Sequence, residues 1–347
     1  MLKKFFGKFS HDLGIDLGTK NTLVYLQDKG IVINEPTVVA VNIKTDEILA
    51  IGEEARKMLG KTPAHIQVVK PLVDGVISDF EITEKMLKYF IDKAHKDGFM
   101  LAPKPRVVIG IPLDITEVEK KAVEDAARAA GARRVYLVEE SMAAAIGARL
   151  PVTEPTATMI VDIGGGTTEI AVIALGGVVT YKALRMAGNE LDNNIVQFVR
   201  EEYNVLIGEQ TAETIKMRIG SATMLKESME LEVRGRDLLY GLPRSVKISD
   251  SQVRETMQRT IRQIIDSIKL TLESTPPELV ADIYEHGIVL TGGGALLRGL
   301  DKEIALETRI PVRVADDPLI SLVKGTGVLL ENQELLDKVA VQNTDEL

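Results

Sequence analysis

The feature of this sequence that most constrains its fold is a pattern that occurs twice. Residues 14–26, GIDLGTKNTLVYL, predict a strand, a tight turn containing glycine, and a second strand. Residues 159–175, MIVDIGGGTTEIAVIAL, repeat this design, and Asp16 and Asp162 are 146 residues apart. Because this period is close to the length of one domain, the repeat predicts two related halves that face each other.

The composition agrees with two domains and excludes several classes of protein. A chain of 347 residues is longer than one hydrophobic core usually requires. Lysine and arginine number 42 against 51 acidic residues, and this net charge of -9 excludes a general nucleic-acid coat, so we expect no nucleic-acid partner. There is no cysteine, which excludes disulfides, thiolate metal sites and cysteine nucleophiles. No apolar run approaches the roughly 20 residues that a membrane span requires.

The rest of the chain alternates between predicted strands and helices, which is typical of α/β layers. Thr116 and Glu119 have the spacing of a capping box and predict a helix that ends at Gly131. The other predicted elements are strands at 106–111, 134–138 and 311–314, an alanine-rich helix after Glu140, a helix-rich segment at 188–230, a hairpin at 232–249, a long helix at 250–273, a helix that begins near Ala295 and a helical segment at 318–338.

Three turns that contain glycine are suited to phosphate binding. Successive backbone N–H groups in such turns can hold an anion, because glycine lacks the Cβ that would block its approach. The first turn follows Asp16, and Thr19 and Asn21 add side-chain donors to it. The second runs from Asp162 to Thr168, and the third, Thr291-Gly292-Gly293-Gly294, precedes a predicted helix whose N-terminus could face a nucleotide.

The two aspartates at the strand ends predict a Mg²⁺ site beside the phosphates. Asp16 and Asp162 would hold the ion, most simply through water molecules. Each glycine turn alone is weak evidence, because such turns after strands are usually only turns. The matching Asp-x-Gly hairpins in two halves favour nucleotide binding over that simpler interpretation.

At these residues the chain resembles the actin/Hsp70/sugar-kinase superfamily. DLGTKNT is similar to its first phosphate motif, DIGGGTTE to its second and LTGGGALLRGL to its adenosine motif. A closer resemblance, to the MreB family of bacterial actins, covers nearly the whole chain. The segments that carry it are NEPTVVA at 34–40, DGVISDF at 74–80, EESMAAAIGARLPV at 139–152, TAETIK at 211–216, PPELVADI at 276–283 and the basic amphipathic start.

The resemblance implies an α/β fold of the actin-like type, a duplicated ribonuclease H-like ATPase. Two large subdomains, each with a smaller inserted subdomain, would surround a nucleotide cleft. The implied boundaries are 1–32, 75–145 and 315–347 for subdomain IA, 33–74 for IB, 146–181 and 245–314 for IIA, and 182–244 for IIB.

The resemblance also implies which residues contact ATP and Mg²⁺. Asp16 and Asp162 would serve the metal. The expected phosphate contacts are Gly18, Thr19, Lys20, Asn21, Gly164, Gly165, Gly166 and Thr167. The expected contacts to the ribose and base are Glu213, Thr214, Ile215 and Lys216, and those on the adenine side are Gly293, Gly294, Ala295 and Leu296.

Glu140 is our candidate for orienting the attacking water, with Thr167 assisting. A carboxylate beside bound phosphates can position water or accept its proton, while Mg²⁺ neutralises the γ-phosphate. The alternative role for Glu140 is an acidic residue in the first turn of a helix, stabilised by the helix dipole. The family usually has proline after the paired glutamates, whereas this chain has Ser141, and proline would fix the first helical turn.

The first ten residues predict a contact with the membrane. On a helical wheel of about 100° per residue, Leu2, Phe5, Phe6 and Phe9 share one arc, opposite Lys3, Lys4 and Lys8. This arrangement predicts a short interfacial helix on anionic lipid. A secretory signal would need a longer apolar region, and an arm packed against its own domain is the remaining alternative. One copy would bind weakly, so firm attachment requires many linked copies.

Phe99 and Met100 form an apolar loop tip in an otherwise polar connection. In the family this position is similar to a membrane-insertion loop. The alternative is a loop whose hydrophobic residues fold back onto the body of the protein.

The resemblance implies a cell-shape-determining cytoskeletal protein of rod-shaped bacteria. It would be an ATPase that forms paired protofilaments on the cytoplasmic face of the inner membrane and organises lateral peptidoglycan synthesis. Its partners would be further copies of itself, the membrane surface, and elongation proteins of the RodZ, MreC and MreD type. The alternatives are a sugar or acetate kinase on the same fold and an Hsp70-type chaperone ATPase, which would need a substrate-binding region beyond residue 347.

Overall fold

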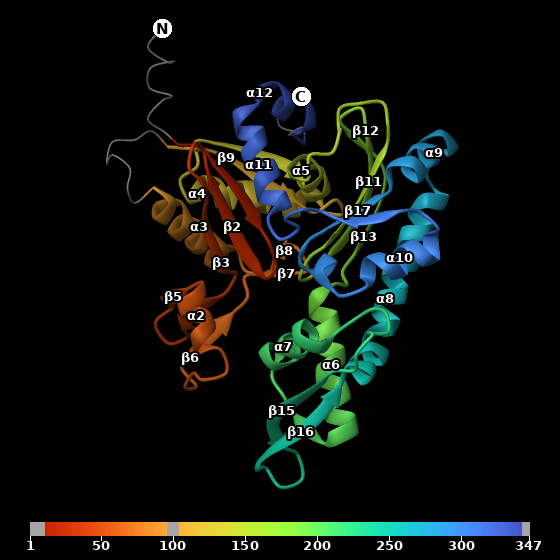
Figure 1. The fold of residues 1–347 in the computed structure, drawn as a ribbon. Helices are drawn as coiled ribbons and strands as arrows, with labels where there is room; N and C mark the ends of the chain where they lie inside the picture. The colour runs from red at the N-terminus through yellow and green to blue at the C-terminus, as the bar shows by residue number, and fades with distance from the viewer. Residues whose placement is uncertain (1–10, 96–103, 342–347) are drawn as a thin grey trace. The chain divides into compact units, whose positions relative to one another are not determined.

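The computed structural model describes residues 11–95 and 104–341, and the chain divides into two compact units (Figure 1). The first unit comprises Met1–Pro155, Ile173–Val178 and Leu319–Leu347. The second comprises Thr156–Val172 and Val179–Pro318. Each unit has its own hydrophobic core.

The first five-stranded sheet is built around the first predicted hairpin. Its strands β1 and β2 are antiparallel, and β1 also pairs in parallel with β9, which pairs in parallel with β10. The order in the sheet is β10-β9-β1-β2-β3. The strands are β1 (Leu13–Leu17), β2 (Asn21–Leu26), β3 (Gly30–Pro36), β9 (Arg106–Ile111) and β10 (Arg134–Glu139).

The second five-stranded sheet has the same plan. Its order is β13-β12-β11-β17-β18, and β11 pairs in parallel with β17, as β1 does with β9. The strands are β11 (Thr158–Ile163), β12 (Thr168–Ala174), β13 (Gly177–Leu184), β17 (Ile288–Thr291) and β18 (Val312–Val314). Read from the opposite edge, the two sheets match strand for strand, so the internal repeat predicted from the sequence is a structural repeat.

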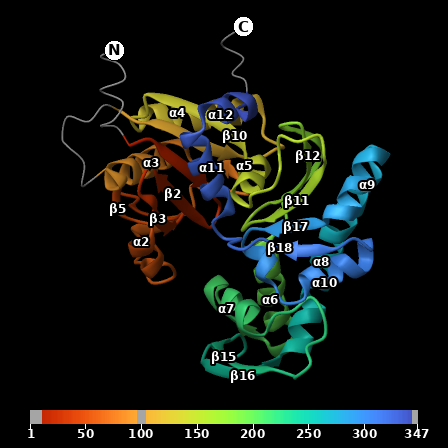
Figure 2. The same cartoon turned by 45° about the horizontal axis from the view of Figure 1, so that its top comes forward.

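The helices of the first unit cover its sheet, and α11 lies beside α5 (Figures 1 and 2). These two helices approach so closely that a Cβ on Gly147 would overlap the carbonyl oxygen of Ser321. The predicted capping box is confirmed, because Thr116 and Glu119 exchange hydrogen bonds at the start of α4. The helices are α3 (Phe80–Ala94), α4 (Glu117–Ala129), α5 (Glu140–Gly147), α11 (Ser321–Glu331) and α12 (Gln333–Val339).

A smaller sheet follows β3 in the first unit. It contains β4 (Val39–Asn42), β5 (Glu47–Ile51) and β6 (Ile66–Val69), with α2 (Glu53–Met58) packed against it. A two-stranded ribbon of β7 (Leu72–Val73) and β8 (Val76–Ile77) then leads into α3.

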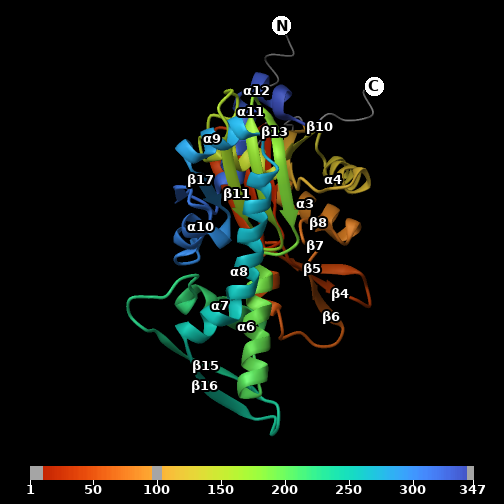
Figure 3. The same cartoon turned by 90° about the vertical axis from the view of Figure 1, so that its right-hand side faces the viewer.

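The second unit carries a group of helices and a three-stranded sheet, β14-β15-β16, at one end (Figure 3). The predicted long helix is confirmed as α8, whose capping box joins Ser249 and Gln252. The elements are α6 (Gly188–Tyr203), α7 (Glu209–Ile219), α8 (Asp250–Glu273), α9 (Pro277–His286), α10 (Leu300–Thr308), β14 (Val205–Leu206), β15 (Glu230–Asp237) and β16 (Pro243–Ser249).

Two helix predictions differ from the structure. The helix expected from Ala295 is instead one 3₁₀ turn, η1 (Gly293–Leu296), and α10 begins only at Leu300. Leu297 is extended and Gly299 has a φ of 75°, so an α-helix cannot run through this segment. The helical segment expected at 318–338 is divided at Asn332, whose side chain accepts a hydrogen bond from Leu335 N and caps α12.

Among the residues that the structure describes, no helix is both long and apolar enough to span a bilayer. Within the same ranges, no group of three or more histidines and acidic residues is arranged to hold a metal ion by itself.

Candidate functional site

The first glycine turn joins β1 and β2, and Asp16 is the last residue but one of β1. A Cβ on Gly18 would lie 2.7 Å from the carbonyl oxygen of Asn21, so only glycine fits here without a shift. Thr37, the residue that follows β3, fixes the turn. Its hydroxyl donates to the Gly18 carbonyl oxygen at 2.7 Å, and its amide donates to the Lys20 carbonyl oxygen at 2.9 Å.

The two predicted side-chain donors of this turn also contact the protein. Thr19 Oγ1 accepts a hydrogen bond from Gly75 N at 3.0 Å, which ties the turn to the ribbon between β7 and β8. The hydroxyl keeps its own proton for donation to a phosphate. Asn21 Nδ2 donates to Asn34 Oδ1 at 2.8 Å, and an amide nitrogen has a second N–H to offer.

The second glycine turn repeats this geometry, since Asp162 is again the last residue but one of its strand. Gly164 N donates to the Thr167 carbonyl oxygen at 2.9 Å and closes the turn. Thr168 is buried, and its hydroxyl donates to the Met186 carbonyl oxygen at 2.7 Å. The side chain of Thr168 is therefore not available to a ligand, and the neighbouring Thr167 is half-buried.

The structure places the third glycine turn against the second. Thr291, at the end of β17, is the register partner of Asp162 at the end of β11. The carboxyl ends of parallel strands meet at one edge of a sheet, so both turns lie at the same edge. Gly292 has a φ of 79°, and a Cβ at this position would overlap Asp162 Oδ1. The third turn is therefore part of the same site as the second.

Asp162 is held in an environment that disfavours its charge. Desolvation by burial raises the pKa of its carboxyl group from the ordinary value of 3.8 to about 7. A cation next to the carboxylate would reverse this effect by stabilising the charged form. Asp162 therefore fits the chemistry of a Mg²⁺ ligand, because a bound cation would favour the charged form of its carboxyl group.

Glu140 is the first residue of α5 and is buried, with 8% of its surface exposed. It follows β10, whose last residue pairs with Ile111 at the carboxyl end of β9. A Cβ on Gly110 would lie 2.9 Å from Leu322 Cδ2 and 3.4 Å from Glu140 Cγ, so Gly110 packs between α11 and the glutamate. Burial also raises the pKa of the neighbouring Glu139, and Lys120 opposes that shift.

Ser141 is fully buried, and within the described ranges its hydroxyl has no hydrogen-bond partner. A buried hydroxyl without a partner costs about 1–3 kcal/mol. The serine that replaces the family's proline therefore contributes nothing polar to the start of α5.

The predicted contacts for ribose and adenine divide into accessible and inaccessible side chains. Ile215 and Ala295 are both buried in the core of the second unit, so their side chains are not available to a ligand. Glu213 is half-buried, Thr214 is exposed and Leu296 is 55% exposed. Just beyond the two segments, Arg298 donates from Nη1 to the Gly220 carbonyl oxygen at 3.1 Å.

Sequence reasoning missed the residues that hold these turns from a distance. Thr37 lies in the NEPTVVA segment, for which the sequence predicts no site role, and Gly188 is not among the predicted site residues. Gly188 N and Asn189 N, at the start of α6, donate to the carbonyl oxygens of Gly164 and Gly165 at 3.2 and 2.8 Å. No local pattern marks either residue, because both contacts join separate segments of the chain.

The predicted membrane residues lie outside the described residues. They are Leu2, Phe5, Phe6, Phe9, Phe99 and Met100.

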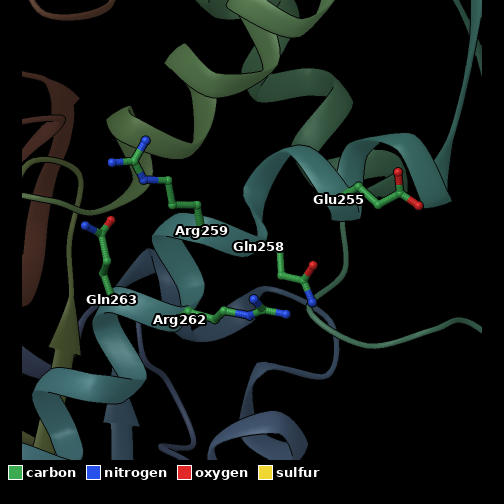
Figure 4. Close-up of a pocket in the computed structure, with 5 residues that line it drawn as sticks. All are labelled: Glu255, Gln258, Arg259, Arg262 and Gln263. Carbon is green, nitrogen blue, oxygen red and sulfur yellow. The ribbon is translucent and has the colours of Figure 1, made fainter.

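A surface hollow of about 360 Å³ lies along α8 (Figure 4). Its lining residues all belong to this one helix, and none is a predicted site residue. They are Glu255, Gln258, Arg259, Arg262 and Gln263. We assign no role to this hollow.

The sequence matches the model of the MreB/Mbl protein family over residues 10–338. It is 51% identical over 335 residues to the cell shape-determining protein MreB of Escherichia coli K12, covering 95% of this chain and 96% of that protein. It is 48% identical over 330 residues to the cell shape-determining protein Mbl of Bacillus subtilis 168, covering 95% and 98%.

Solved structures show the same fold. MreB5 of Spiroplasma citri bound to ADP matches with a TM-score of 0.89 and 37% identity, covering 93% of this chain and 97% of that one. A MamK double helical filament matches with a TM-score of 0.79 and 25% identity, covering 92% and 98%.

Proposed function

Because the chain belongs to the MreB/Mbl family, we propose that it is a cell shape-determining cytoskeletal protein that binds ATP and assembles into filaments. The observation that carries this proposal is the structural repeat, in which each sheet presents an Asp-x-Gly hairpin at the same position. The Spiroplasma relative is bound to ADP in one structure and to AMPPNP in another, and the MamK relative is a double helical filament.

The glycine turns supply the binding chemistry for the phosphates. In each unit, the backbone N–H groups of the glycine turn offer donors for phosphate oxygens, and Thr19, Lys20 and Asn21 add donors in the first unit. Asp16 and Asp162 would serve a bound Mg²⁺, and the raised pKa of Asp162 fits a carboxylate that a cation would keep charged. When bound, Mg²⁺ would neutralise charge at the transferred phosphate. The segments of α7 and η1 would receive the nucleoside.

Hydrolysis depends on Glu140, with Thr167 assisting. The glutamate orients a water molecule toward the γ-phosphate and accepts its proton. Its burial at the start of α5 fixes the carboxylate, which is the condition for an oriented water. ATP binding favours the filament and hydrolysis weakens it.

Filament formation also explains how a short membrane anchor suffices. Residues 1–9 and the Phe99 loop bind the inner face of the cell membrane weakly in one copy and firmly in a polymer. At the membrane the filament, in paired protofilaments, organises lateral wall synthesis with elongation proteins of the RodZ, MreC and MreD type.

The test is co-pelleting of the protein with liposomes of anionic lipid, with and without Mg²⁺-ATP. We expect ATP-dependent polymer that pellets with the liposomes, and deletion of residues 1–9 should weaken lipid binding while polymerisation persists. A protein that stays monomeric with ATP at high concentration and phosphorylates a sugar or acetate would establish the kinase alternative instead. Unchanged lipid binding after the deletion would move the membrane contact to the Phe99 loop.

A further inference from the structure

The ammonium group of Lys216 lies between α7 and the start of α6. Nζ donates to the carbonyl oxygen of Gly188 at 2.8 Å and forms an ion pair with Asp192 Oδ1 at 2.7 Å. Both side chains are buried, with 14% of Lys216 and 4% of Asp192 exposed. Removal of one partner of such a pair leaves the other charge buried without compensation, so the pair holds the two helices together.

The same glycine is attached to the second phosphate turn. Gly188 N donates to the Gly164 carbonyl oxygen at 3.2 Å, and Asn189 N donates to the Gly165 carbonyl oxygen at 2.8 Å. A Cβ on Gly188 would lie 3.2 Å from that Gly164 oxygen and 3.4 Å from Lys216 Nζ. Gly188 is therefore packed between the lysine and the turn, and a displacement of either one displaces the other.

We propose that Lys216, together with Asp192, is a positioning residue that fixes the phosphate-binding turn 164–167 through the start of α6. This inference rests on the proposed nucleotide site. Phosphate recognition by a turn depends on the direction of its backbone N–H groups. The start of α6 donates hydrogen bonds to the carbonyl oxygens of Gly164 and Gly165, so the position of α6 sets the orientation of the turn. Lys216 in turn sets the position of the start of α6.

This role differs in its consequences from a direct contact between Lys216 and the ribose. If Lys216 contacts the ribose directly, removal of the ribose hydroxyl removes the contribution of Lys216 to nucleotide affinity. If Lys216 positions the phosphate turn, it contributes equally to the affinity for a nucleotide that lacks this hydroxyl. The two effects can be separated by a double-mutant cycle in which one of the two changes is made in the ligand.

The experiment measures the affinity of the full-length protein for Mg²⁺-ATP, 2′-deoxy-ATP and 3′-deoxy-ATP by calorimetry, for the wild type and K216M. We expect K216M to lose roughly tenfold or more in affinity for ATP, because a displaced turn loses phosphate contacts. The loss of affinity when ATP is replaced by either deoxy nucleotide (the deoxy penalty) should be the same in K216M as in the wild type. A deoxy penalty that disappears in K216M, or an ATP affinity that does not change, would overturn the inference.

Further variants complete the test. D192N should weaken ATP binding in the same direction, and the double variant should lose less than the product of the two single losses. The matched control is K226M, an exposed lysine of the same unit, which should bind all three nucleotides like the wild type. If K216M does not fold, D192N carries the same deoxy comparison, because it removes the charge of the ion pair on the other partner.

Failure of the proposed function is distinguishable from failure of this inference. A wild-type protein that binds no Mg²⁺-ATP overturns both. A wild type that binds ATP, with additive losses in the K216M and D192N double variant, overturns only the coupling of Lys216 to the phosphate turn.

Discussion

Asp162 and Thr291 are register partners at the carboxyl ends of the adjacent parallel strands β11 and β17. Gly292 follows Thr291, and its backbone lies so close that a Cβ would overlap Asp162 Oδ1. Two segments separated by more than a hundred residues thus form one edge of a sheet, where an acidic group and two glycine turns meet. Most of the predictions below test the function of this edge or of its counterpart in the first sheet.

Substitution G292A should damage both stability and nucleotide binding. Gly292 has a φ of 79°, a conformation that costs a side chain of the L configuration about 1–3 kcal/mol, and the new methyl group would also displace Asp162. We expect a lower melting temperature and at least a roughly tenfold loss of affinity for Mg²⁺-ATP. G177A is the matched control, since nothing lies within 4 Å of a Cβ there, and it should behave like the wild type. Equal behaviour of the two variants would contradict the packing argument.

The affinity for Mg²⁺-ATP should rise with pH between about 6 and 8. The pKa of Asp162 is about 7, so in the protein without ligand the carboxyl is mostly protonated at pH 6 and mostly charged at pH 8. Mg²⁺ requires the charged form, and the ionised fraction grows roughly tenfold across this interval. Calorimetry should show this increase in affinity for the wild type. D162N lacks the carboxyl group and should show only the pH dependence that comes from the titration of ATP.

The same group makes a second, independent prediction for stability without ligand. The pKa of Asp162 is raised in the folded state, so the folded protein binds a proton that the unfolded chain has released above about pH 4. The unfolding free energy should therefore fall, relative to D162N, as the pH rises from about 4 to 7, and the difference should be constant above that. A wild type that gains stability relative to D162N over this range would show that the carboxyl is not desolvated.

Substitution E140A should slow hydrolysis without preventing ATP binding. Removal of a general base typically costs about 10²–10⁴-fold in rate, and Glu140 lies at the start of α5 rather than in a phosphate turn. Phosphate release and ATP affinity should be measured on the same preparation. E117A, an exposed glutamate at the start of α4, is the control for a helix-terminal acid. Hydrolysis that E140A leaves unchanged would remove the assigned role.

Substitution S141P should stabilise the protein. Ser141 lies in the first turn of α5, where proline is tolerated, and its buried hydroxyl has no partner among the described residues. We expect the unfolding free energy to rise by about 0.5–1 kcal/mol, because proline restricts the conformations of the unfolded chain. S141A removes the hydroxyl alone, so S141P should be at least as stable as S141A in denaturant titrations. A proline variant less stable than the alanine variant would mean that the start of α5 does not accept the ring.

Substitution G325A should be strongly destabilising although alanine is the better helix former. A Cβ on Gly325 would overlap the carbonyl oxygen of Ala143, where α11 packs against α5. The gain in helix propensity is about 1 kcal/mol, and forced overpacking costs about 3 kcal/mol, so packing decides the sign. The control is V328A on the exposed side of α11, which should cost much less. A stabilised G325A variant would show that the two helices can separate without cost.

Local signals in the sequence predicted the elements that depend on a few neighbouring residues. The hairpin around Gly18, the capping box of Thr116 and Glu119, and the span of α8 were all confirmed. Each depends on alternation, helical periodicity or a cap, which act over one or two turns of chain. The prediction near Ala295 was wrong because Leu297 is extended and Gly299 has a positive φ, and because Arg298 forms a bridge with the distant Ser221.

The sequence by itself determined that two related halves each carry an acidic strand end and a glycine turn. It could do so because these residues lie next to one another in the chain. Only the tertiary structure decided that Thr291 stands beside Asp162, that Thr37 holds the first turn, and that Lys216 reaches the second through Gly188. These contacts join segments far apart in sequence, and their geometry follows from the register of parallel strands and the packing of helices, which no local pattern encodes.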